Sequence, residues 1–270
     1  MPEVKSVPAL LNLIKRIPLP YKKGLVYRLM GKQLAAEGMG WYPVYTGHIW
    51  KLDLRNPCHQ WMLYDRYADA AFLQWTEKQI PGNGIIVDSG SNIGQFLPYF
   101  SKIVPKGKVL AFEPGRELGD WIEACLAENM LPVELIRKGL GSEAFSAFLN
   151  SWGEEQIHGL WGQVNEEKGE PIVVERLDAI LHERKIDTVD LWKLDVEGYE
   201  VQALEGAGDF IANKKIKALY IEMAVKENNH QKIMEFMRKH DYKPYSFNAL
   251  GKLKPMQDVF DDHMDALFLA

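Results

Sequence analysis

The segment over residues 85–96 constrains the fold of this chain more than any other. The β-branched residues 85–87 lead into Asp88, and small or polar residues follow at once. Such a sequence is typical of a buried parallel strand, a tight turn and then a helix. Gly90 and Gly94 lack a Cβ atom, so the backbone of this turn can approach a ligand closely. We therefore expect a ligand site just beyond the end of this strand.

The spacing of the two glycines argues against a phosphate ligand. Gly90 and Gly94 are four residues apart and Asp88 precedes them, whereas a dinucleotide site would read G-x-G-x-x-G and a P-loop would need Gly-Lys-Ser/Thr. A turn that carries a carboxylate suits a ligand with positive charge, and S-adenosylmethionine carries both an ammonium and a sulfonium group. Ser91 or Asn92 is expected to cap the helix that follows.

A second strand ends in an acid about twenty residues further on, at Glu113. A carboxylate at the end of the second strand commonly accepts hydrogen bonds from the ribose hydroxyls of a nucleoside. Asp88 and Glu113 together favour an adenosine-containing ligand, although Asp88 alone is also compatible with a simple turn residue.

Composition excludes several classes of protein. The chain has 270 residues, 47% of them hydrophobic, which is enough for one substantial core. A net charge of −5 argues against a nucleic-acid partner, and two cysteines are too few for a disulfide framework. No apolar run approaches the ~20 residues of a membrane span, and no signal peptide is visible at the N-terminus. We therefore expect a cytoplasmic protein.

The first 37 residues differ from the rest in charge. Seven basic and two acidic residues give 7 − 2 = +5, which leaves −10 for the remainder of the chain. Apolar residues recur there at helical spacing, so residues 1–40 are expected to form a basic, amphipathic helical extension before a catalytic domain over residues 41–270. The extension either packs on this domain or on a second subunit, as in a homodimer, or makes a weak contact with a membrane or an anionic acceptor.

From residue 85 onward, strands alternate with helices, which is typical of a doubly wound, mostly parallel sheet. Seven strands are expected near residues 85–88, 108–113, 133–137, 191–195, 217–222, 242–246 and 265–269. Helices are expected near residues 62–79, 93–103, 116–129, 200–212 and 229–240. Two strand pairs are expected outside this sheet, one within residues 41–54 and one made of residues 145–151 and 172–175. The catalytic core begins at about residue 80.

Lys193 and Asp195 lie two residues apart on one expected strand, so their side chains point to the same side. A lone lysine in a buried strand is costly, and it should therefore pair with Asp195 or Glu197. Such a pair marks a functional site or pins the strand to its helix, and both readings stay open.

Several blocks of the chain resemble the FkbM-type methyltransferases. They are Val87-Asp88-Ser89-Gly90-Ser91-Asn92-Ile93-Gly94, Ala111-Phe112-Glu113-Pro114, Gly139-Leu140-Gly141, Arg176-Leu177-Asp178-Ala179-Ile180-Leu181 and Lys193-Leu194-Asp195-Val196-Glu197-Gly198-Tyr199-Glu200. The resemblance covers about residues 44–270. It implies an α/β, class I, Rossmann-like methyltransferase with a seven-stranded sheet and helices on both faces, using S-adenosylmethionine. Ser89 and Ser91 are departures, since the family more often has an apolar residue and alanine there.

The resemblance also implies roles for particular residues. Asp88, Gly90, Asn92 and Gly94 would line the methionine part of the cofactor, and Glu113 would hold the ribose. The full set expected to bind the cofactor is Asp88, Ser89, Gly90, Ser91, Asn92, Gly94, Glu113, Pro114, Lys138, Gly139, Leu140 and Asp195.

A hydroxyl acceptor must lose a proton during methyl transfer, which calls for a nearby base. Asp195 is the first candidate, with Lys193 steadying its carboxylate. The further candidates are Glu197, Glu222, His263 and His158. No metal site is expected, because no tight ligand spacing is present, although strand-end carboxylates that hold a divalent cation remain an alternative.

These predictions describe an O-methyltransferase whose acceptor is a small molecule, a sugar, a lipid-linked glycan or another secondary metabolite. Methylation of a nitrogen or a carboxyl group by the same fold is an alternative. A non-catalytic module that binds S-adenosylmethionine is another, and the missing G-x-G-x-x-G disfavours a nicotinamide dehydrogenase.

Overall fold

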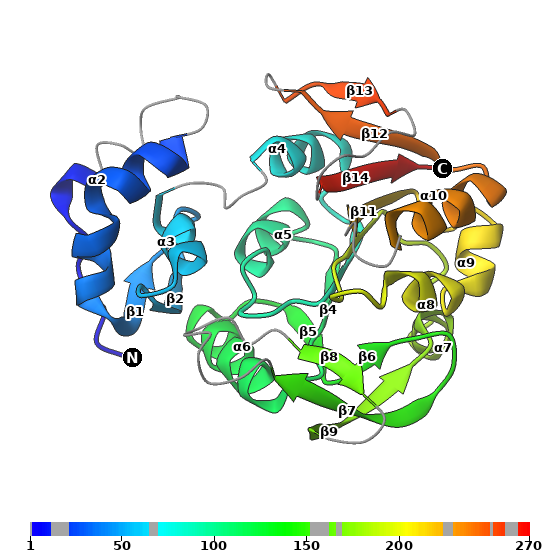
Figure 1. Cartoon of the computed structure of the whole chain (residues 1–270), viewed down its shortest axis with the longest axis horizontal. Helices are drawn as coiled ribbons and strands as arrows, with labels where there is room; N and C mark the ends of the chain where they lie inside the picture. The colour runs from blue at the N-terminus through cyan, green and yellow to red at the C-terminus, as the bar shows by residue number, and fades with distance from the viewer. Residues whose placement is uncertain are drawn as a thin grey trace.

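A central eight-stranded sheet dominates the computed structural model (Figure 1), which describes residues 2–11, 22–64, 70–151, 162–165, 169–223, 229–248, 251–256 and 264–270. From one edge to the other, its strands are β13 (Leu253–Pro255), β12 (Lys243–Phe247), β14 (Met264–Leu269), β11 (Ala218–Met223), β10 (Leu191–Leu194), β3 (Ile85–Ser89), β4 (Lys108–Phe112) and β5 (Val133–Ile136). All seven expected strands are present, and the short edge strand β13 adds an eighth.

The five strands from β11 to β5 run parallel to one another, and β14, β12 and β13 join antiparallel. Helices cover both faces of the sheet, because alternate residues along each strand point to opposite sides. Ile86 and Leu191 pack with helices α2 to α6, whereas Val87 and Trp192 pack with α7 to α10. The predicted α/β fold with a mostly parallel sheet is therefore confirmed.

The helices agree with the predicted positions in part. They are α2 (Lys22–Glu37), α3 (Pro57–Tyr64), α4 (Ala70–Gln79), α5 (Leu97–Ile103), α6 (Arg116–Asn129), α7 (Leu177–Glu183), α8 (Glu200–Glu205), α9 (Gly208–Ala212) and α10 (Asn229–Lys239). The helix expected over 200–212 is two short helices, because the chain turns at Gly206 and Ala207. Within residues 62–79 the structure likewise has the end of α3 and all of α4.

The prediction that Ser91 or Asn92 caps the next helix is wrong. Helix α5 begins only at Leu97, and Phe96 occupies the position before it. Asn92 has φ 53° and Gly94 has φ 78°, and this left-handed backbone cannot belong to a right-handed α-helix. The segment between β3 and α5 is therefore a longer turn than the sequence indicated.

A second, four-stranded sheet lies beside the central one, in the order β6 (Gly139–Leu140), β9 (Glu170–Glu175), β7 (Phe145–Ser151) and β8 (Gly162–Asn165). The predicted pairing of 145–151 with 172–175 is confirmed, since β7 and β9 are antiparallel partners.

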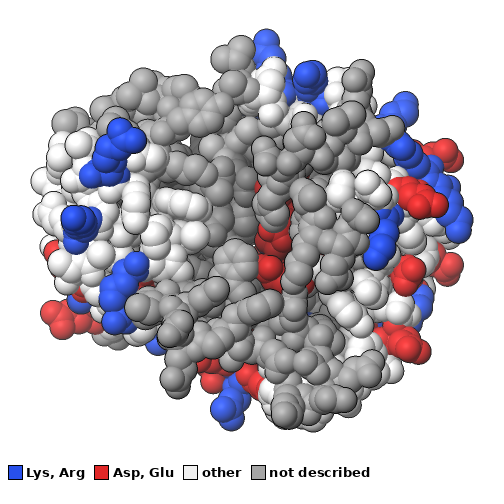
Figure 2. Space-filling view, viewed as in Figure 1, with Lys and Arg blue, Asp and Glu red and all other residues white. Residues whose placement is uncertain are grey.

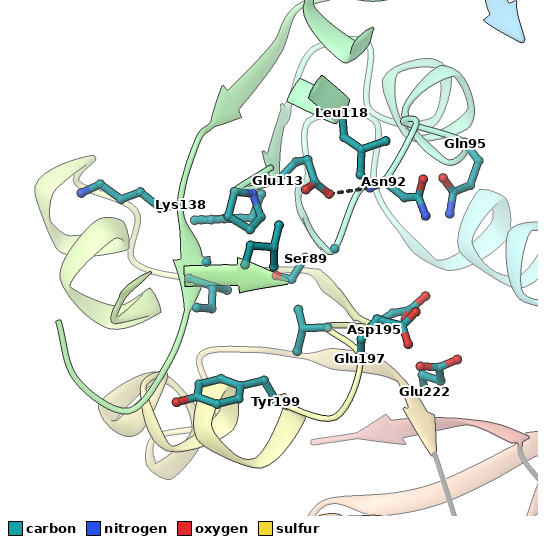
Figure 3. Close-up of a pocket in the computed structure, with 17 residues that line it drawn as sticks. Ser89, Asn92, Gln95, Glu113, Leu118, Lys138, Asp195, Glu197, Tyr199 and Glu222 are labelled. Carbon is teal, nitrogen blue, oxygen red and sulfur yellow. Dashed lines mark hydrogen bonds between the residues drawn. The ribbon is translucent and has the colours of Figure 1, made fainter. Parts of the chain in front are cut away.

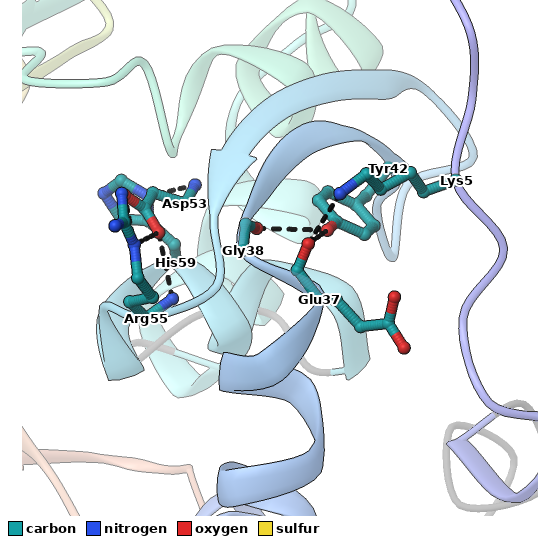
Figure 4. A network of polar contacts seen from close by, with 7 residues as sticks. All are labelled: Lys5, Glu37, Gly38, Tyr42, Asp53, Arg55 and His59. Atoms are coloured by element: carbon teal, nitrogen blue, oxygen red, sulfur yellow. Dashed lines mark hydrogen bonds and ion pairs between the residues drawn. The ribbon is translucent and has the colours of Figure 1, made fainter.

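The N-terminal part of the chain contains α2 and the hairpin of β1 (Met39–Pro43) and β2 (Ile49–Asp53), which confirms the expected strand pair. The hydroxyl of Tyr42 donates to the carbonyl oxygens of Glu37 and Gly38, at 3.2 and 3.0 Å, and Lys5 Nζ donates to Glu37 O at 2.6 Å (Figure 4). These bonds tie the end of α2 to the hairpin. A domain boundary near residue 40 stays a prediction.

Apolar residues of α2 lie on more than one face. Val26, Met30 and Leu34 are buried, whereas Tyr27 is 48% and Leu29 is 65% exposed. Within the described ranges, no helix combines the length and the apolar composition that a bilayer crossing requires. Contact of this region with a membrane or with a second subunit stays a prediction.

Substitution of Gly90 tests the close approach of the turn after β3 to the backbone of Asp195, which follows β10. Its φ is 76°, and a Cβ atom there would overlap the carbonyl oxygen of Asp195. We expect Gly90→Ala to lower the free energy of unfolding by at least about 2 kcal/mol, measured by urea denaturation. In the control Gly24→Ala, the new Cβ meets open space on α2, so stability should rise by about 0.5–1 kcal/mol. Equal effects of the two substitutions would contradict this account.

Candidate active site

The candidate functional residues lie together at the carboxyl ends of the parallel strands of the central sheet. The parallel strands β4, β3, β10 and β11 end there, and Glu113, Ser89, Asp195 and Glu222 lie at or just beyond their ends. These side chains line a cavity of about 930 Å³, counting its open mouth (Figure 3).

The structure brings most of the predicted site residues to this cavity. Those that line it are Ser89, Gly90, Asn92, Glu113, Pro114, Lys138, Gly139, Leu140, Asp195, Glu197 and Glu222. Asp88, Ser91, Gly94 and Lys193 do not line it. His263 and His158 lie outside the described residues.

The turn after β3 is held by the neighbouring strand. The backbone N–H groups of Gly90 and Ser91 both donate to Phe112 O, at 3.1 and 3.0 Å. Asn92 N donates to Glu113 Oε2 at 2.9 Å. The turn therefore keeps its shape through bonds to β4 and to the residue that follows it.

Glu113 is a buried carboxylate with two backbone partners. Gly115 N donates to Oε1 at 3.0 Å, in addition to the bond from Asn92, and the residue is only 5% exposed. Burial raises the pKa of Glu113 to about 7, although both backbone N–H groups favour the charged form. Each carboxylate oxygen has a second lone pair, so Glu113 can also accept hydrogen bonds from a ligand in the cavity.

Lys193 links two carboxylates beneath the cavity. Its Nζ atom lies 2.9 Å from Asp195 Oδ2 and 3.9 Å from Asp88 Oδ1, and 5.1 Å from the ring centroid of Phe96. Burial alone lowers the pKa of Lys193, but Asp195 and Asp88 outweigh burial and hold that pKa above its ordinary value. The expected pairing of Lys193 with Asp195 is therefore present, and the lysine is charged.

Asp88 is completely buried and lies opposite Lys193 in the register of β3 and β10. Burial raises the pKa of Asp88 to about 6, and the charge of Lys193 limits this rise. Because Asp88 does not line the cavity, it affects a ligand there through Lys193 and the turn rather than by direct contact.

Asp195, Glu197 and Glu222 form an acidic cluster in the cavity, with one carboxylate oxygen from each lying within 4.8 Å of the others. Burial raises the pKa of Glu197 to about 7 and that of Glu222 to about 10, and Asp195 adds to both shifts. Figure 2 shows acidic side chains inside the hollow of this face, while the Lys and Arg side chains in view lie outside it.

The backbone around Glu197 is fixed by Glu200. Glu197 has φ 56° and Gly198 has φ 97°, and Glu200 Oε1 accepts from the N–H groups of Val196 and Gly198 at 3.0 and 3.1 Å. Glu200 thus has a structural role in this turn. It directs Glu197 toward Asp195 and Glu222.

Other lining residues were missed from the sequence. Gln95 belongs to the turn after β3, and its place directly after Gly94 was a usable signal. Leu118 comes from α6 and Leu149 from β7, so only the tertiary fold brings them together. These apolar side chains lie in the same cavity as Glu113, and they suit the flat base of a nucleoside whose ribose Glu113 would hold.

Comparison with known proteins shows which family the chain belongs to. The model of the methyltransferase FkbM domain matches residues 88–244, which is more than half of the chain. Methyltransferase sdnD of Sordaria araneosa is 29% identical over 162 residues, covering 48% of this chain and 62% of that protein, less than two thirds of its length. Methyltransferase 1 of Beauveria bassiana is 27% identical over 189 residues, and the alignment covers 62% of this chain and 73% of that protein.

Among solved structures, precorrin-6y C5,15-methyltransferase from Geobacter metallireducens aligns at 11% identity with a TM-score of 0.43. The alignment covers 76% of this chain and 89% of that one.

The ion pair of Lys193 generates a testable prediction. Lys193→Met leaves the buried carboxylate of Asp88 and the partly exposed carboxylate of Asp195 without their cation, so the free energy of unfolding at pH 8 should fall by about 3 kcal/mol. The loss should shrink at pH 5, because Asp88 then takes up a proton: its pKa of about 6 rises further without the lysine. Urea denaturation at both pH values measures this.

The matched control is Lys217→Met. Lys217 lies 2.6 Å from Asp190, but its side chain is 59% exposed, so its removal should cost at most about 1 kcal/mol. A loss for Lys193→Met that is no larger than the control, or that does not change with pH, would contradict the assignment.

Proposed function

The chain belongs to the FkbM methyltransferase family, and on this premise we propose that it transfers the methyl group of S-adenosylmethionine to a hydroxyl group. The acceptor proposed is a sugar, a glycan or another secondary metabolite. One observation carries the proposal: Glu113 and Asp195, at the ends of strands on either side of β3, face the same cavity. A cofactor with a ribose at one end and a sulfonium at the other would fit between them.

Glu113 would bind the ribose hydroxyls, since an ionised carboxylate accepts hydrogen bonds from both. The adenine would lie against Leu118 and Leu149, with Pro114 and the segment 138–140 beside it. The methionine end would lie along the turn over Ser89, Gly90 and Asn92. Asp88, Ser91 and Gly94, which are also among the residues expected to bind the cofactor, lie outside the cavity. We propose that they support the turn and do not contact the cofactor directly.

The acceptor would enter beside the acidic cluster. The sulfonium is an activated leaving group, so the protein mainly orients the two reactants and excludes water. Asp195 would take the hydroxyl proton, and Lys193 would hold its carboxylate in place. Glu197 is the alternative base in the same cluster, whereas Glu222, predicted as a further base, has a pKa of about 10 and would keep its own proton near neutral pH.

Cofactor binding tests the proposal first. Calorimetry should show that S-adenosylhomocysteine binds and that NAD and ATP do not. Binding should weaken as the pH falls below about 7, because protonated Glu113 loses an acceptor for the ribose. The loss between pH 8 and pH 6 should approach tenfold, and Glu113→Gln should weaken binding at pH 8 by a similar factor.

Glu117→Gln is the control for this measurement, because Glu117 is exposed on α6 outside the cavity, and it should change nothing. Tight binding of NAD without S-adenosylhomocysteine would overturn the cofactor assignment. Equal affinity of Glu113→Gln and the wild type would remove the role of Glu113.

A screen with methyl-labelled S-adenosylmethionine against sugars, nucleotide sugars, polyketides and lipid-linked glycans tests the acceptor class. Label on a nitrogen or a carboxyl group would replace the O-methylation proposal. Cofactor binding without transfer to any acceptor would favour a non-catalytic module.

With an acceptor in hand, Asp195→Asn should reduce kcat by about 100-fold or more and leave the affinity for S-adenosylhomocysteine within a few-fold. Asp187→Asn is the control, since Asp187 is exposed in a loop away from the cavity. Near-normal turnover of Asp195→Asn would exclude Asp195 as the base.

A further inference from the structure

The acidic cluster of Asp195, Glu197 and Glu222 has a geometry that the proposed chemistry does not by itself require. Three carboxylates from two strand ends and the following turn converge, with one oxygen of each within 4.8 Å of the others (Figure 3). Like charges repel at such distances, so their convergence needs either a proton held by Glu222, whose pKa is raised to about 10, or a compensating positive charge.

The protein supplies only part of that charge. Counting Asp88, Asp195, Glu197 and Glu222 against Lys193 leaves 4 − 1 = 3 negative charges when all are ionised. Among the described residues that line the cavity, Lys138 is the basic one, and its Nζ lies 3.6 Å from Glu175. Figure 3 shows Lys138 on the far side of the cavity from the cluster.

Gln95 gives a second, independent indication of a ligand. It lines the same cavity and is only 6% exposed, and its Oε1 atom has no hydrogen-bond partner in the described part of the chain. In Figure 3 its amide group lies beside that of Asn92, on the same side of the cavity as Asp195 and Glu222. A buried amide oxygen without a partner is unfavourable unless a ligand satisfies it.

We propose that Asp195, Glu197 and Glu222, together with the amide oxygen of Gln95, bind a divalent cation such as Mg²⁺ or Mn²⁺. Carboxylate and amide oxygens are the ligands that these hard cations prefer. Oxygens bound to one such ion at about 2.0–2.6 Å from it lie within about 5 Å of one another, as these carboxylates do. Lys193 Nζ donates to Oδ2 of Asp195, and Glu222 also bonds to the Asp195 carboxylate, so an ion would have to replace the contact between these two acids.

The role of the cation rests on the proposed function. An acceptor hydroxyl bound to the ion would become more acidic. Its O–H bond would break, with the proton passing to a carboxylate oxygen that does not contact the ion. The oxygen would form a bond to the methyl carbon as the S–CH₃ bond breaks, and S-adenosylhomocysteine would leave.

Titration calorimetry of the full chain with Mg²⁺ or Mn²⁺ alone tests the site without any cofactor or acceptor. We expect saturable binding of one ion per chain. Glu222→Gln and Glu197→Gln should each weaken it at least about tenfold, and Gln95→Ala should weaken it to a smaller extent. Glu117→Gln, which removes an exposed carboxylate of α6, should bind the ion as the wild type does.

Affinity for S-adenosylhomocysteine, measured separately, shows that each variant is folded and separates this inference from the proposed function. Absence of saturable binding in a wild type that still binds S-adenosylhomocysteine would overturn the cation site alone. Unchanged ion affinity in Glu222→Gln and Glu197→Gln would also overturn it. Ion binding without S-adenosylhomocysteine binding would support the site and count against the cofactor.

Discussion

The ammonium group of Lys193 is the interaction on which the rest of the site depends. It lies inside the sheet, 3% exposed, between a carboxylate of the neighbouring strand and one at the end of its own strand. A buried ion of either sign is unstable alone, so Lys193, Asp88 and Asp195 must be present together. Their mutual attraction adds to the backbone pairing of β3 and β10, directly beneath the cavity.

The parallel arrangement of β4, β3, β10 and β11 explains why so many acidic residues lie together at one end of these strands. Parallel neighbours end on the same side of a sheet, so the residues that follow β4, β3 and β10 share one cleft, and Glu222 near the end of β11 joins them. Burial then raises the pKa of Glu113 and Glu197 to about 7. These groups change charge near neutral pH, which suits them to bind or release ligands and protons there.

The sequence was most informative where function is carried by contiguous residues. The strand, turn and acid around Asp88, the acid at Glu113 and the Lys193–Asp195 pair could all be predicted, because each depends on strand period or on strand ends. The family resemblance added the order of these blocks, and the match over residues 88–244 confirms it.

The sequence was least informative about features that depend on an unusual backbone conformation or on contacts between distant elements. Helix α5 begins later than the sequence predicts, since no local signal shows that Asn92 adopts a left-handed backbone. Leu118 and Leu149 reach the cavity from other elements, and the approach of Glu222 to Glu197 depends on the pairing of β10 with β11 and on the turn that Glu200 holds. Spacing along the chain contains none of this information.

A crystal structure of the protein with S-adenosylhomocysteine tests the central claim most directly. We expect the ribose hydroxyls to contact the carboxylate of Glu113 and the sulfur atom to face Asp195. A nucleoside bound elsewhere, or one in this cavity that leaves Glu113 without a contact, would contradict it.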